Sequence, residues 1–338
     1  MICKARGLSR MGLRYRGARV RQNACRHRAQ LQYQADDDCT ASNMKSVSML
    51  EGVDRLMLTT VRLTSFFDKQ ELGHATGFFY HGRLDGKPNY WLVTNWHVVS
   101  GRNALDPTVC LNRKIGAVPN RLQLRLILAA ATPEYAANAD QQQLLMQEQS
   151  IQLYDNDGRA VWKQHRLKNE IDIAVINCAA GVTTDRYQVV GANEAAQQND
   201  MAIEIGNDVF ILGYPLGFSH FLETPIWKKG SIASEPNFET LDTKGRIIID
   251  ATTRAGMSGA PVFMRAKTHY VSENGEIKAH VNATRLIGIY ASRPNLKSQG
   301  DDVEEDRRAE VGYVYKSGHI HDTIVNGIRG PDFGCLPT

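Results

Sequence analysis

The chain has 338 residues, 42% of them hydrophobic, which is typical of a globular protein of one large or two small domains. No stretch approaches the ~20 apolar residues that a membrane-spanning helix requires, so we expect no membrane partner. The net charge of +4 divides into +6 for residues 1–43 and −2 for the remainder. A near-neutral body argues against nucleic-acid binding except through the basic tail.

The tail at residues 1–43 carries nine Lys and Arg and no acidic residue before Asp36. Three interpretations stay open: an arm that binds polyanions, an organelle-targeting segment, or a translated upstream stretch with Met44 as the true start. We favour a disordered tail without a catalytic role, because its composition cannot build a core.

Cysteine usage and the absence of a leader motif bear on the compartment. The six cysteines show neither metal-type spacing nor a paired pattern, which indicates a reducing compartment. They are Cys3, Cys25, Cys39, Cys110, Cys178 and Cys335. The tail has no apolar segment of the kind found in a secretory signal. We therefore expect a cytoplasmic protein, with organelle targeting by the Arg-rich tail left open.

Residues 50–130 have the pattern of short strands separated by turns. Residues 84–89 contain Asp-Gly and predict a hairpin turn. The apolar strand that follows, residues 90–93, runs directly into His97. The Ala/Gln/Leu-rich segment 133–150 predicts a helical insertion in this half.

Two groups of aspartates follow. Asp155 and Asp157 lie in an Asp-Asn-Asp-Gly sequence that predicts a tight hairpin turn. Asp172 lies at the mouth of the apolar run 171–176, where a buried carboxylate requires a partner. All three are candidate acids, but an aspartate in a turn usually serves to form the turn. Asp172 is therefore the preferred candidate.

The second half begins after a segment rich in Gly, Ala, Asn and Gln, residues 181–200, which predicts a linker. Apolar strands resume at 209–212. Residues 273–276 (Glu-Asn-Gly-Glu) predict another hairpin. The heavily charged residues 299–310 predict a solvated loop, and a last helix is expected at 317–328.

The octet GMSGAPVF at residues 256–263 carries the chemistry. A serine flanked by glycines and followed by proline and an apolar run is typical of a nucleophile on a tight turn. The N–H groups of Gly256 and Ser258 can then stabilise a developing oxyanion. A serine hydroxyl also needs a base and a group that orients the base. His97 and Asp172 are the candidates; His165, an alternative base, lacks the strand-end context.

These segments resemble the trypsin-like (chymotrypsin-fold) serine peptidases, and the order His97, Asp172, Ser258 is that of the family. Further segments resemble strands and turns of the bacterial branch. They are Ala75-Thr76-Gly77-Phe78-Phe79-Tyr80, Phe210-Ile211-Leu212-Gly213-Tyr214-Pro215-Leu216-Gly217, Trp227-Lys228-Lys229-Gly230-Ser231-Ile232 and Leu286-Ile287-Gly288-Ile289-Tyr290. The chain departs from many relatives in having no Arg/Lys-Ile-Val-Gly-Gly activation site. It also has no room after Tyr315 for a C-terminal peptide-binding module.

The resemblance implies an all-β fold of two antiparallel six-stranded barrels, with a short C-terminal helix and the inserted helix in the first half. We expect a basic tail over 1–43 and a first barrel over 44–180 that carries His97 and Asp172. A linker over 181–200 then leads to a second barrel with the C-terminal helix over 201–330.

The resemblance implies a serine endopeptidase that forms an acyl-enzyme on Ser258, with His97 as general base and Asp172 as its orienter. The N–H groups of Gly256 and Ser258 would hold the oxyanion, and no metal or cofactor is required. In the family the floor of the primary pocket lies six residues before the nucleophile, at Thr252 here. A threonine there predicts a preference for small or apolar side chains.

The same resemblance implies further substrate contacts. The strand that contains Tyr290, Ala291 and Ser292 is expected to pair with the substrate backbone, and its side chains are expected to narrow the pocket. Arg254 lies close enough in sequence to leave an acidic preference open. The expected partners are a protein or peptide substrate, with a regulatory partner protein left open.

Two alternatives from other functional classes remain. One is a catalytically silent pseudopeptidase that uses the cleft to bind peptides, against which all three triad positions are present. The other is a nucleic-acid-associated protein that uses the tail, for which binding must be salt-sensitive and must disappear when residues 1–43 are removed.

Overall fold

The structure is a computed structural model that describes most of the chain after the tail. The described residues are 54–129, 146–180, 182, 184–196, 199–220, 223–238, 245–279, 282–291 and 310–335. All of them belong to the unit Ser48–Thr338. The tail 1–43, residues 130–145, Ser292 and residues 299–309 lie outside the described residues.

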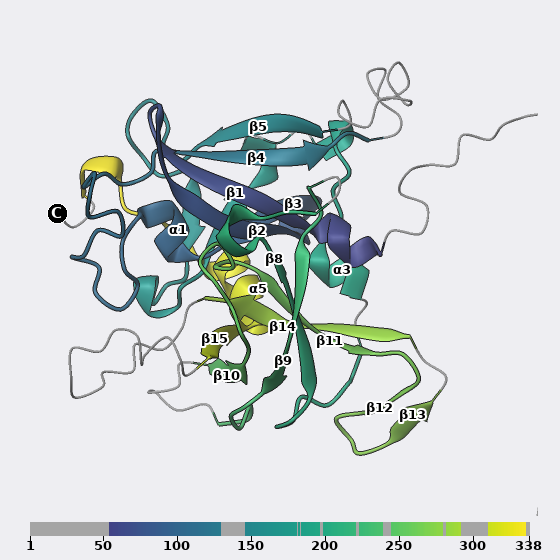
Figure 1. Cartoon of the computed structure of the whole chain (residues 1–338). Helices are drawn as coiled ribbons and strands as arrows, with labels where there is room; N and C mark the ends of the chain where they lie inside the picture. The colour runs from purple at the N-terminus through teal and green to yellow at the C-terminus, as the bar shows by residue number, and fades with distance from the viewer. Residues whose placement is uncertain are drawn as a thin grey trace, which may run out of the picture. The chain divides into compact units, whose positions relative to one another are not determined.

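Seven strands of the first half and one strand near the C-terminus form one antiparallel sheet (Figure 1). Across the sheet the order is β16 (Ile328–Arg329), β6 (Trp162–Gln164), β7 (Ala174–Asn177), β3 (Lys87–Thr94), β2 (Gln70–Leu84), β1 (Thr60–Phe67), β4 (Arg121–Ile127) and β5 (Met146–Gln152). Asp85 and Gly86 both have positive φ, 49° and 77°, at the predicted hairpin turn between β2 and β3. Such a turn matches the twist of the flanking strands.

This sheet curls around one hydrophobic core without closing into the expected first barrel. Its two flanks both contribute to that core, β5 through Ile151 and β6 through Trp162. The free edge of β6 is paired instead with β16, where Ile328 lies opposite Gln164. A strand near the C-terminus therefore occupies the edge that closure would have used. The prediction of a six-stranded first barrel is not confirmed.

The second half forms a closed six-stranded barrel, as predicted. Its strands, in order around the barrel, are β10 (Arg246–Asp250), β15 (Val311–Lys316), β14 (Ala283–Tyr290), β11 (Pro261–Ala266), β8 (Asp208–Gly213) and β9 (Ile226–Ile232). Alternate residues of β10, Ile247 and Ile249, are fully buried in its core. This period of two is what a strand with one inward face requires.

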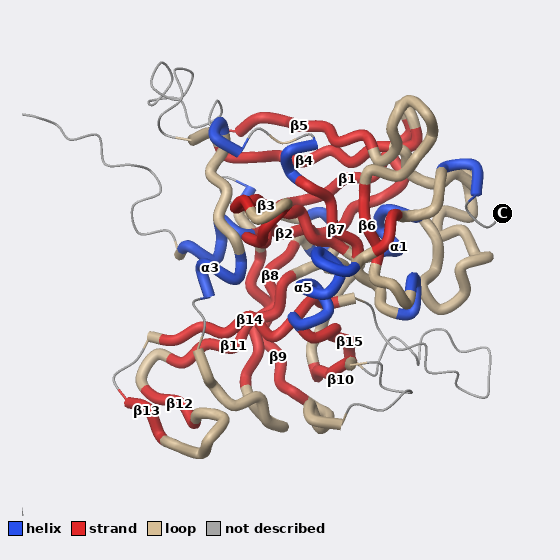
Figure 2. The backbone as a smooth tube through the Cα atoms, turned by 180° about the vertical axis from the view of Figure 1, so that it is seen from behind, coloured by secondary structure: helices blue, strands red, loops and turns tan. Residues whose placement is uncertain are grey.

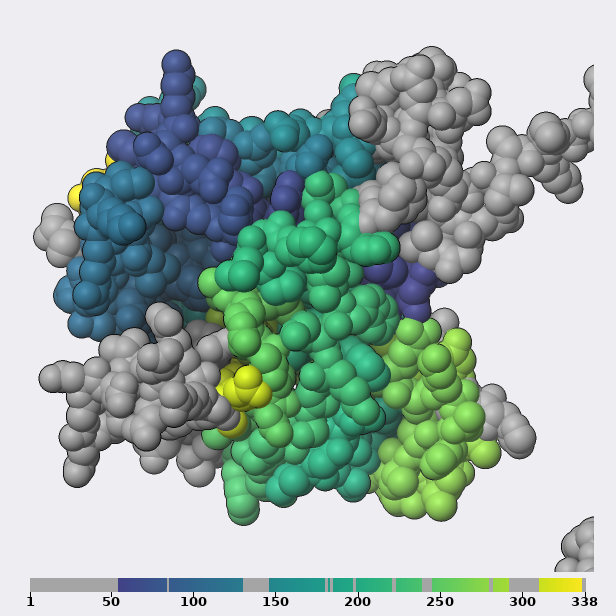
Figure 3. All heavy atoms as spheres, in the orientation of Figure 1, coloured from purple at the N-terminus to yellow at the C-terminus, as the bar shows by residue number. Residues whose placement is uncertain are grey.

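A third core joins the sheet to the barrel. β3 divides its side chains between cores, with Leu92 in the core of the sheet and Trp91 and Val93 in the joining core. From the barrel side come Leu212, Phe263 and Ile289. Helix α5 (Ser317–Asn326) adds Ile320 and Ile324, and both views show it between the two halves (Figures 1 and 2). In Figure 3 the purple and blue surface of residues 54–129 lies beside the green surface of the barrel.

The remaining elements are short. Within the described ranges, the α-helices besides α5 are α1 (Trp96–Ser100) and α3 (Ala192–Ala196). The 3-10 helices are η1 (Arg55–Thr59), η3 (Lys168–Glu170), η4 (Cys178–Ala180), η5 (Thr184–Arg186), η6 (Pro215–Gly217) and η8 (Phe333–Cys335). The prediction of a helix over 133–150 was wrong where it can be examined, because Met146 to Ser150 pair with β4 as strand β5. Pairing with an existing sheet edge overrides local helix propensity.

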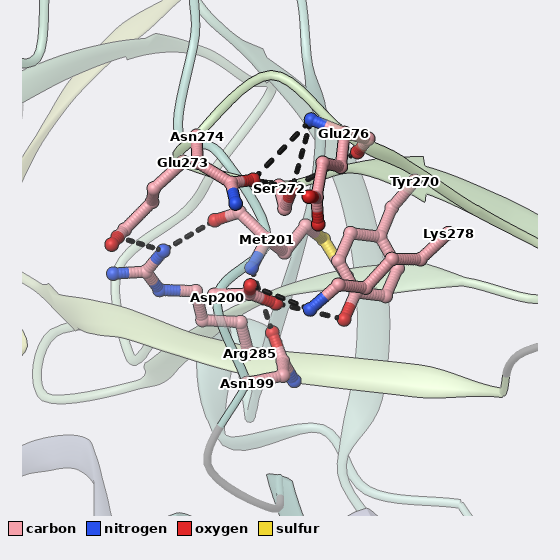
Figure 4. Close-up of polar contacts among 10 residues, drawn as sticks. All are labelled: Asn199, Asp200, Met201, Tyr270, Ser272, Glu273, Asn274, Glu276, Lys278 and Arg285. Atoms are coloured by element: carbon pink, nitrogen blue, oxygen red, sulfur yellow. Dashed lines mark hydrogen bonds and ion pairs between the residues drawn. The ribbon is translucent and has the colours of Figure 1, made fainter.

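The predicted hairpin at residues 273–276 is present as a ribbon of β12 (His269–Val271) and β13 (Ile277–Ala279). Polar contacts fasten it to the end of the predicted linker (Figure 4). Asp200 accepts hydrogen bonds from Lys278 (2.6 Å) and Tyr270 (3.0 Å), and the bond from Lys278 lowers the pKa of the Asp200 carboxyl. Arg285 pairs with Glu273 at 2.6 Å. The ribbon is thus held at both of its strands.

Candidate active site

The structure brings His97 and Asp172 into direct contact, although 75 residues separate them. The Nδ1 atom of His97 lies 2.7 Å from Oδ2 of Asp172, and the backbone N–H of His97 donates to Oδ1 at 2.9 Å. The Asp172 side chain is 3% exposed and that of His97 is 16% exposed. With Nδ1 facing a carboxylate, Nε2 of the ring is left to act as the acceptor, which is the tautomer a general base needs.

Local structure explains this pairing. Strand β3 ends at Thr94, and His97 lies in the first turn of helix α1 that follows. Asn95, fully buried between them, donates through Nδ2 to the backbone carbonyl of Asp172 at 2.7 Å. Asp172 lies two residues before the first residue of β7, which pairs with β3. Because β3 and β7 are antiparallel neighbours, the end of β3 and the start of β7 lie at the same end of the sheet, which brings His97 and Asp172 together.

Ser258 lies on a turn that only glycines can form. Gly256 and Gly259 have φ of 92° and 87°. A Cβ on Gly256 would lie 2.3 Å from the carbonyl oxygen of Tyr214, so this position has neither the conformation nor the space for a side chain. Within the described part of the chain, the N–H groups of Gly256 and Ser258 donate to no protein acceptor, whereas Met257 between them bonds to Arg254.

Thr76 of β2 anchors this turn to the first half of the molecule. Its Oγ1 donates to the carbonyl of Gly256 at 2.7 Å and accepts from the N–H of Tyr214 at 3.1 Å. Its own N–H donates to the carbonyl of Ser258 at 2.8 Å. Thr76 is fully buried. The turn that bears the serine is thereby fixed to the sheet that bears the histidine.

A cavity of about 510 Å³ opens at these residues. His97, Gly256 and Ser258 all line it. Its other walls come from β2 around Leu72 and from the loop that contains Arg113. A serine hydroxyl, an imidazole already oriented by a carboxylate, and free backbone donors therefore share one accessible space.

The expected substrate-binding residues are in less open surroundings. Thr252 donates through Oγ1 to Oε2 of Glu310 at 2.7 Å. The hydroxyl of Tyr290 lies 2.6 Å from Oγ1 of Thr253, and both residues are buried. Ala291, also buried, donates its N–H to the carbonyl of Tyr313. None of the three expected residues described, Thr252, Tyr290 and Ala291, lines the 510 Å³ cavity.

The alternative candidates have other partners. Nε2 of His165 lies 2.8 Å from Asp322 on α5, and its Nδ1 accepts from the N–H of Leu167. Asp155 accepts from two N–H groups of its own turn, those of Asp157 and Arg159. Neither His165 nor these aspartates line the cavity. They hold local structure together.

The surroundings of Asp172 keep a neighbouring phenol neutral. Burial and the Asp172 carboxylate both raise the pKa of Tyr315, whose hydroxyl donates to the carbonyl of Glu170 at 3.0 Å.

In the part of the chain that the structure describes, no group of three or more His, Cys, Asp or Glu side chains is arranged to hold a metal ion. No helix among those residues is long and apolar enough to cross a membrane.

Four residues at the site received no role from the sequence: Thr76, Asn95, Thr253 and Glu310. Thr76 lies within a segment that resembles the family, but a threonine in a strand is ordinary. Asn95 directly precedes a helix, where asparagine is a common cap. Thr253 and Glu310 find their partners only through tertiary contacts. No local signal distinguishes any of them.

The chain is similar in sequence to a known family of domains. A family model described as a trypsin-like peptidase domain matches residues 75–269. No curated protein matches the chain. Among solved structures, an inactive form of the Rv3671c protease aligns at 16% identity, TM-score 0.39, over 83% of this chain and 95% of that one. An inactive serine-to-alanine mutant of Rv3671c from M. tuberculosis aligns over 83% and 92%, also at 16% identity and 0.39.

The serine endoprotease from Yersinia pestis aligns at 13% identity and TM-score 0.40, over 80% of this chain and 62% of that one. Structural similarity at this level is too low to carry an argument. The family match spans the histidine, aspartate and serine segments and more than half of the 338 residues. The chain therefore belongs to the family of trypsin-like peptidase domains.

Proposed function

We propose that this chain is a serine endopeptidase in which Ser258 is the nucleophile, His97 the general base and Asp172 the group that orients it. The single observation that carries the proposal is the 2.7 Å contact between Nδ1 of His97 and Asp172, beside a cavity that Ser258 shares. The family match independently supports peptidase chemistry.

In the proposed reaction, Oγ of Ser258 bonds to the carbonyl carbon of the scissile peptide while its proton passes to Nε2 of His97. The N–H groups of Gly256 and Ser258 stabilise the oxyanion. The C–N bond then breaks, and His97 gives the proton to the leaving amine. Water next attacks the acyl ester and its proton passes through His97 to Oγ, which releases the acid and restores the serine.

On the acyl side we propose a preference for small side chains next to the scissile bond. The Tyr290 side chain fills the space between the residues that lead to Ser258 and strand β15. Its hydroxyl meets Thr253, and a Cβ on Gly312 would lie 2.4 Å from its ring. The carboxylate of Glu310 is already engaged by Thr252.

Labelling with a fluorophosphonate probe tests the nucleophile. The wild type is expected to gain one adduct by intact mass, and Ser258→Ala and His97→Ala are expected to abolish it. The matched control is Ser65→Ala, because Ser65 lines the same cavity but hydrogen-bonds to the carbonyl of Gly73. This variant should label like the wild type.

A well-folded wild type that does not label would contradict the proposal and favour the pseudopeptidase. Labelling that persists in Ser258→Ala but disappears in Ser65→Ala would show that Ser65, and not Ser258, is the nucleophile. Circular dichroism of each variant excludes loss of the fold as the cause.

Substitution of Tyr290 tests the acyl-side preference. Tyr290→Ala should raise kcat/KM for substrates with Leu or Phe before the scissile bond by roughly tenfold or more, because filling an apolar pocket is worth that much discrimination. Tyr290→Phe keeps the ring and loses only the hydroxyl, so it should retain the preference for Gly and Ala. A wild type that prefers Leu or Phe would refute this assignment.

A further inference from the structure

The 510 Å³ cavity at Ser258 is lined mostly by residues of the first half of the chain. Beyond Ser258 and His97 it is bounded by Val98, by residues 72–75 of β2 and by the loop that contains residues 111–119. All of these belong to the first half of the chain, and Ala255 and Gly256 beside the serine also line the cavity from the second half. Thr253 and Tyr290 do not line it.

The chemistry of acyl transfer predicts which half of the substrate binds in this cavity. The inference rests on the proposed function. The acyl half stays bonded to Ser258, while the leaving amine must take its proton from His97 and so departs on the side of the imidazole. Because the cavity wall continues from His97 to Val98 and Gly101, it surrounds the leaving half. A space of about 510 Å³ holds more than one residue.

The walls combine apolar side chains with two cations. Leu72, Val98 and Pro119 line the cavity, as does Leu111, which is 50% exposed. Arg113 and Lys114 line it as well, and both are exposed. Among the described residues that line it there is no carboxylate, and neither cation forms an ion pair within the described part of the chain. His74, a further lining residue, lies 3.4 Å from Glu71.

The Tyr290 side chain, by contrast, is enclosed by its neighbours. Tyr290 is 3% exposed and its ring occupies the volume against Gly312. We therefore expect the 510 Å³ cavity to discriminate between substrates.

We propose that this peptidase selects its substrates chiefly through the two residues that follow the scissile bond. An apolar side chain packs against Leu72, Val98 and Leu111. A neighbouring carboxylate is attracted by Arg113 and Lys114. The preferred substrate therefore carries an apolar and an acidic residue directly after a small residue at the cleavage point.

Competition between amine acceptors and water for one acyl-enzyme measures the preference for the leaving half of the substrate separately from the preference for the acyl half. A small N-acylglycine ester acylates Ser258, and a dipeptide amide then competes with water for the acyl group. The amine bonds to the acyl carbon, the C–O bond to Ser258 breaks, and the amine proton passes through His97 to Oγ. The acceptors are Leu-Asp, Leu-Asn and Leu-Arg amides and their reversed sequences, and chromatography gives the ratio of aminolysis to hydrolysis.

The wild type should favour the Asp acceptor over its Asn isostere by roughly threefold to tenfold, and over the Arg acceptor by more, as expected for exposed or half-exposed charge pairs. The double variant Arg113→Gln/Lys114→Gln should reduce the Asp-to-Asn ratio to about one. Raised salt should reduce the ratio in the wild type.

The matched control is Arg83→Gln/Lys87→Gln, which removes one arginine and one lysine, both exposed, from the β2–β3 turn outside the cavity. This control should keep the wild-type ratio. Equal partitioning of the Asp and Asn acceptors by the wild type, or a ratio unchanged in the Arg113/Lys114 variant, would overturn the inference and leave the proposed function intact. Absence of any acyl-enzyme on the wild type would overturn both.

Discussion

Replacement of Thr76 by valine tests how the nucleophile turn is held. Valine has nearly the shape of threonine but lacks the hydroxyl that donates to Gly256 and accepts from Tyr214, at 2.7 and 3.1 Å. Both partners are backbone groups in buried surroundings, and Thr76 itself is 0% exposed. The variant therefore leaves one buried carbonyl and one buried N–H without a partner.

The magnitude follows from the two bonds. Each buried polar group left unsatisfied costs about 1–3 kcal/mol, and relief from burying the hydroxyl itself offsets part of this. We expect the free energy of unfolding of Thr76→Val to fall by about 2–4 kcal/mol. Because the Gly256 carbonyl loses its anchor, the neighbouring N–H donors lose alignment. Loss of one oxyanion donor costs on the order of 100-fold in kcat, so we expect a decrease of roughly 10- to 100-fold.

Urea unfolding followed by tryptophan fluorescence gives the stability, and ester hydrolysis normalised to fluorophosphonate-titratable sites gives kcat. Thr76→Ser is the control, because it keeps the hydroxyl and removes only a methyl group, at about 1 kcal/mol. It should retain kcat within a few-fold. If valine and serine variants had the same unfolding midpoint and the same kcat, the assignment of Thr76 as the anchor of the turn would be refuted.

Three further substitutions probe the site and its support. Asp172→Asn should lower kcat by roughly 10³- to 10⁴-fold, because the amide no longer favours the tautomer of His97 that accepts the serine proton; a decrease below tenfold in steady-state hydrolysis would argue against the pair. Gly259→Ala should abolish soluble folded protein or unfold in the mildest urea, since φ is 87° and its Cβ would lie 2.1 Å from the Thr76 carbonyl oxygen. Burial lowers the pKa of His165 below 6.5, an effect that outweighs the attraction of Asp322. The unfolded chain therefore binds the proton more readily, so stability is complete above about pH 6.5 and declines as pH falls toward the folded pKa. The urea concentration at the unfolding midpoint should fall between pH 8 and pH 5 in the wild type, and should fall less in His165→Gln. Equal pH dependence in the two proteins would contradict the assignment to His165.

Local chemistry was enough to identify the turns and the candidate catalytic residues. Asp-Gly and Asn-Gly pairs mark the hairpins at residues 85–86 and 274–275, because few residues adopt the left-handed backbone of a tight turn. The glycines around Ser258 indicate the tight turn of the candidate nucleophile for the same reason. A histidine at a strand end and a carboxylate inside an apolar run are each unusual in isolation, and this made His97 and Asp172 predictable.

Sequence reasoning failed where an outcome depended on a distant partner. Residues 146–150 have a helix-like composition, yet the open edge of β4 makes them strand β5. Closure of the first barrel was expected from resemblance, but the pairing of β16 with β6 depends on where α5 docks. Such competition between sheet edges leaves no trace in a local pattern.

The sequence by itself determined the strand periodicity, the turn positions and the identity of three chemically suited side chains, because each depends on near neighbours. Only the tertiary structure decided that Asp172 meets His97 at 2.7 Å and that Thr76 holds Gly256 across 180 residues. It also decided that Tyr290 is buried against Thr253 and Gly312, and that Arg113 and Lys114 line the same cavity as Ser258. The geometry of the candidate site arises from contacts between segments far apart in the chain, and packing brings those segments together.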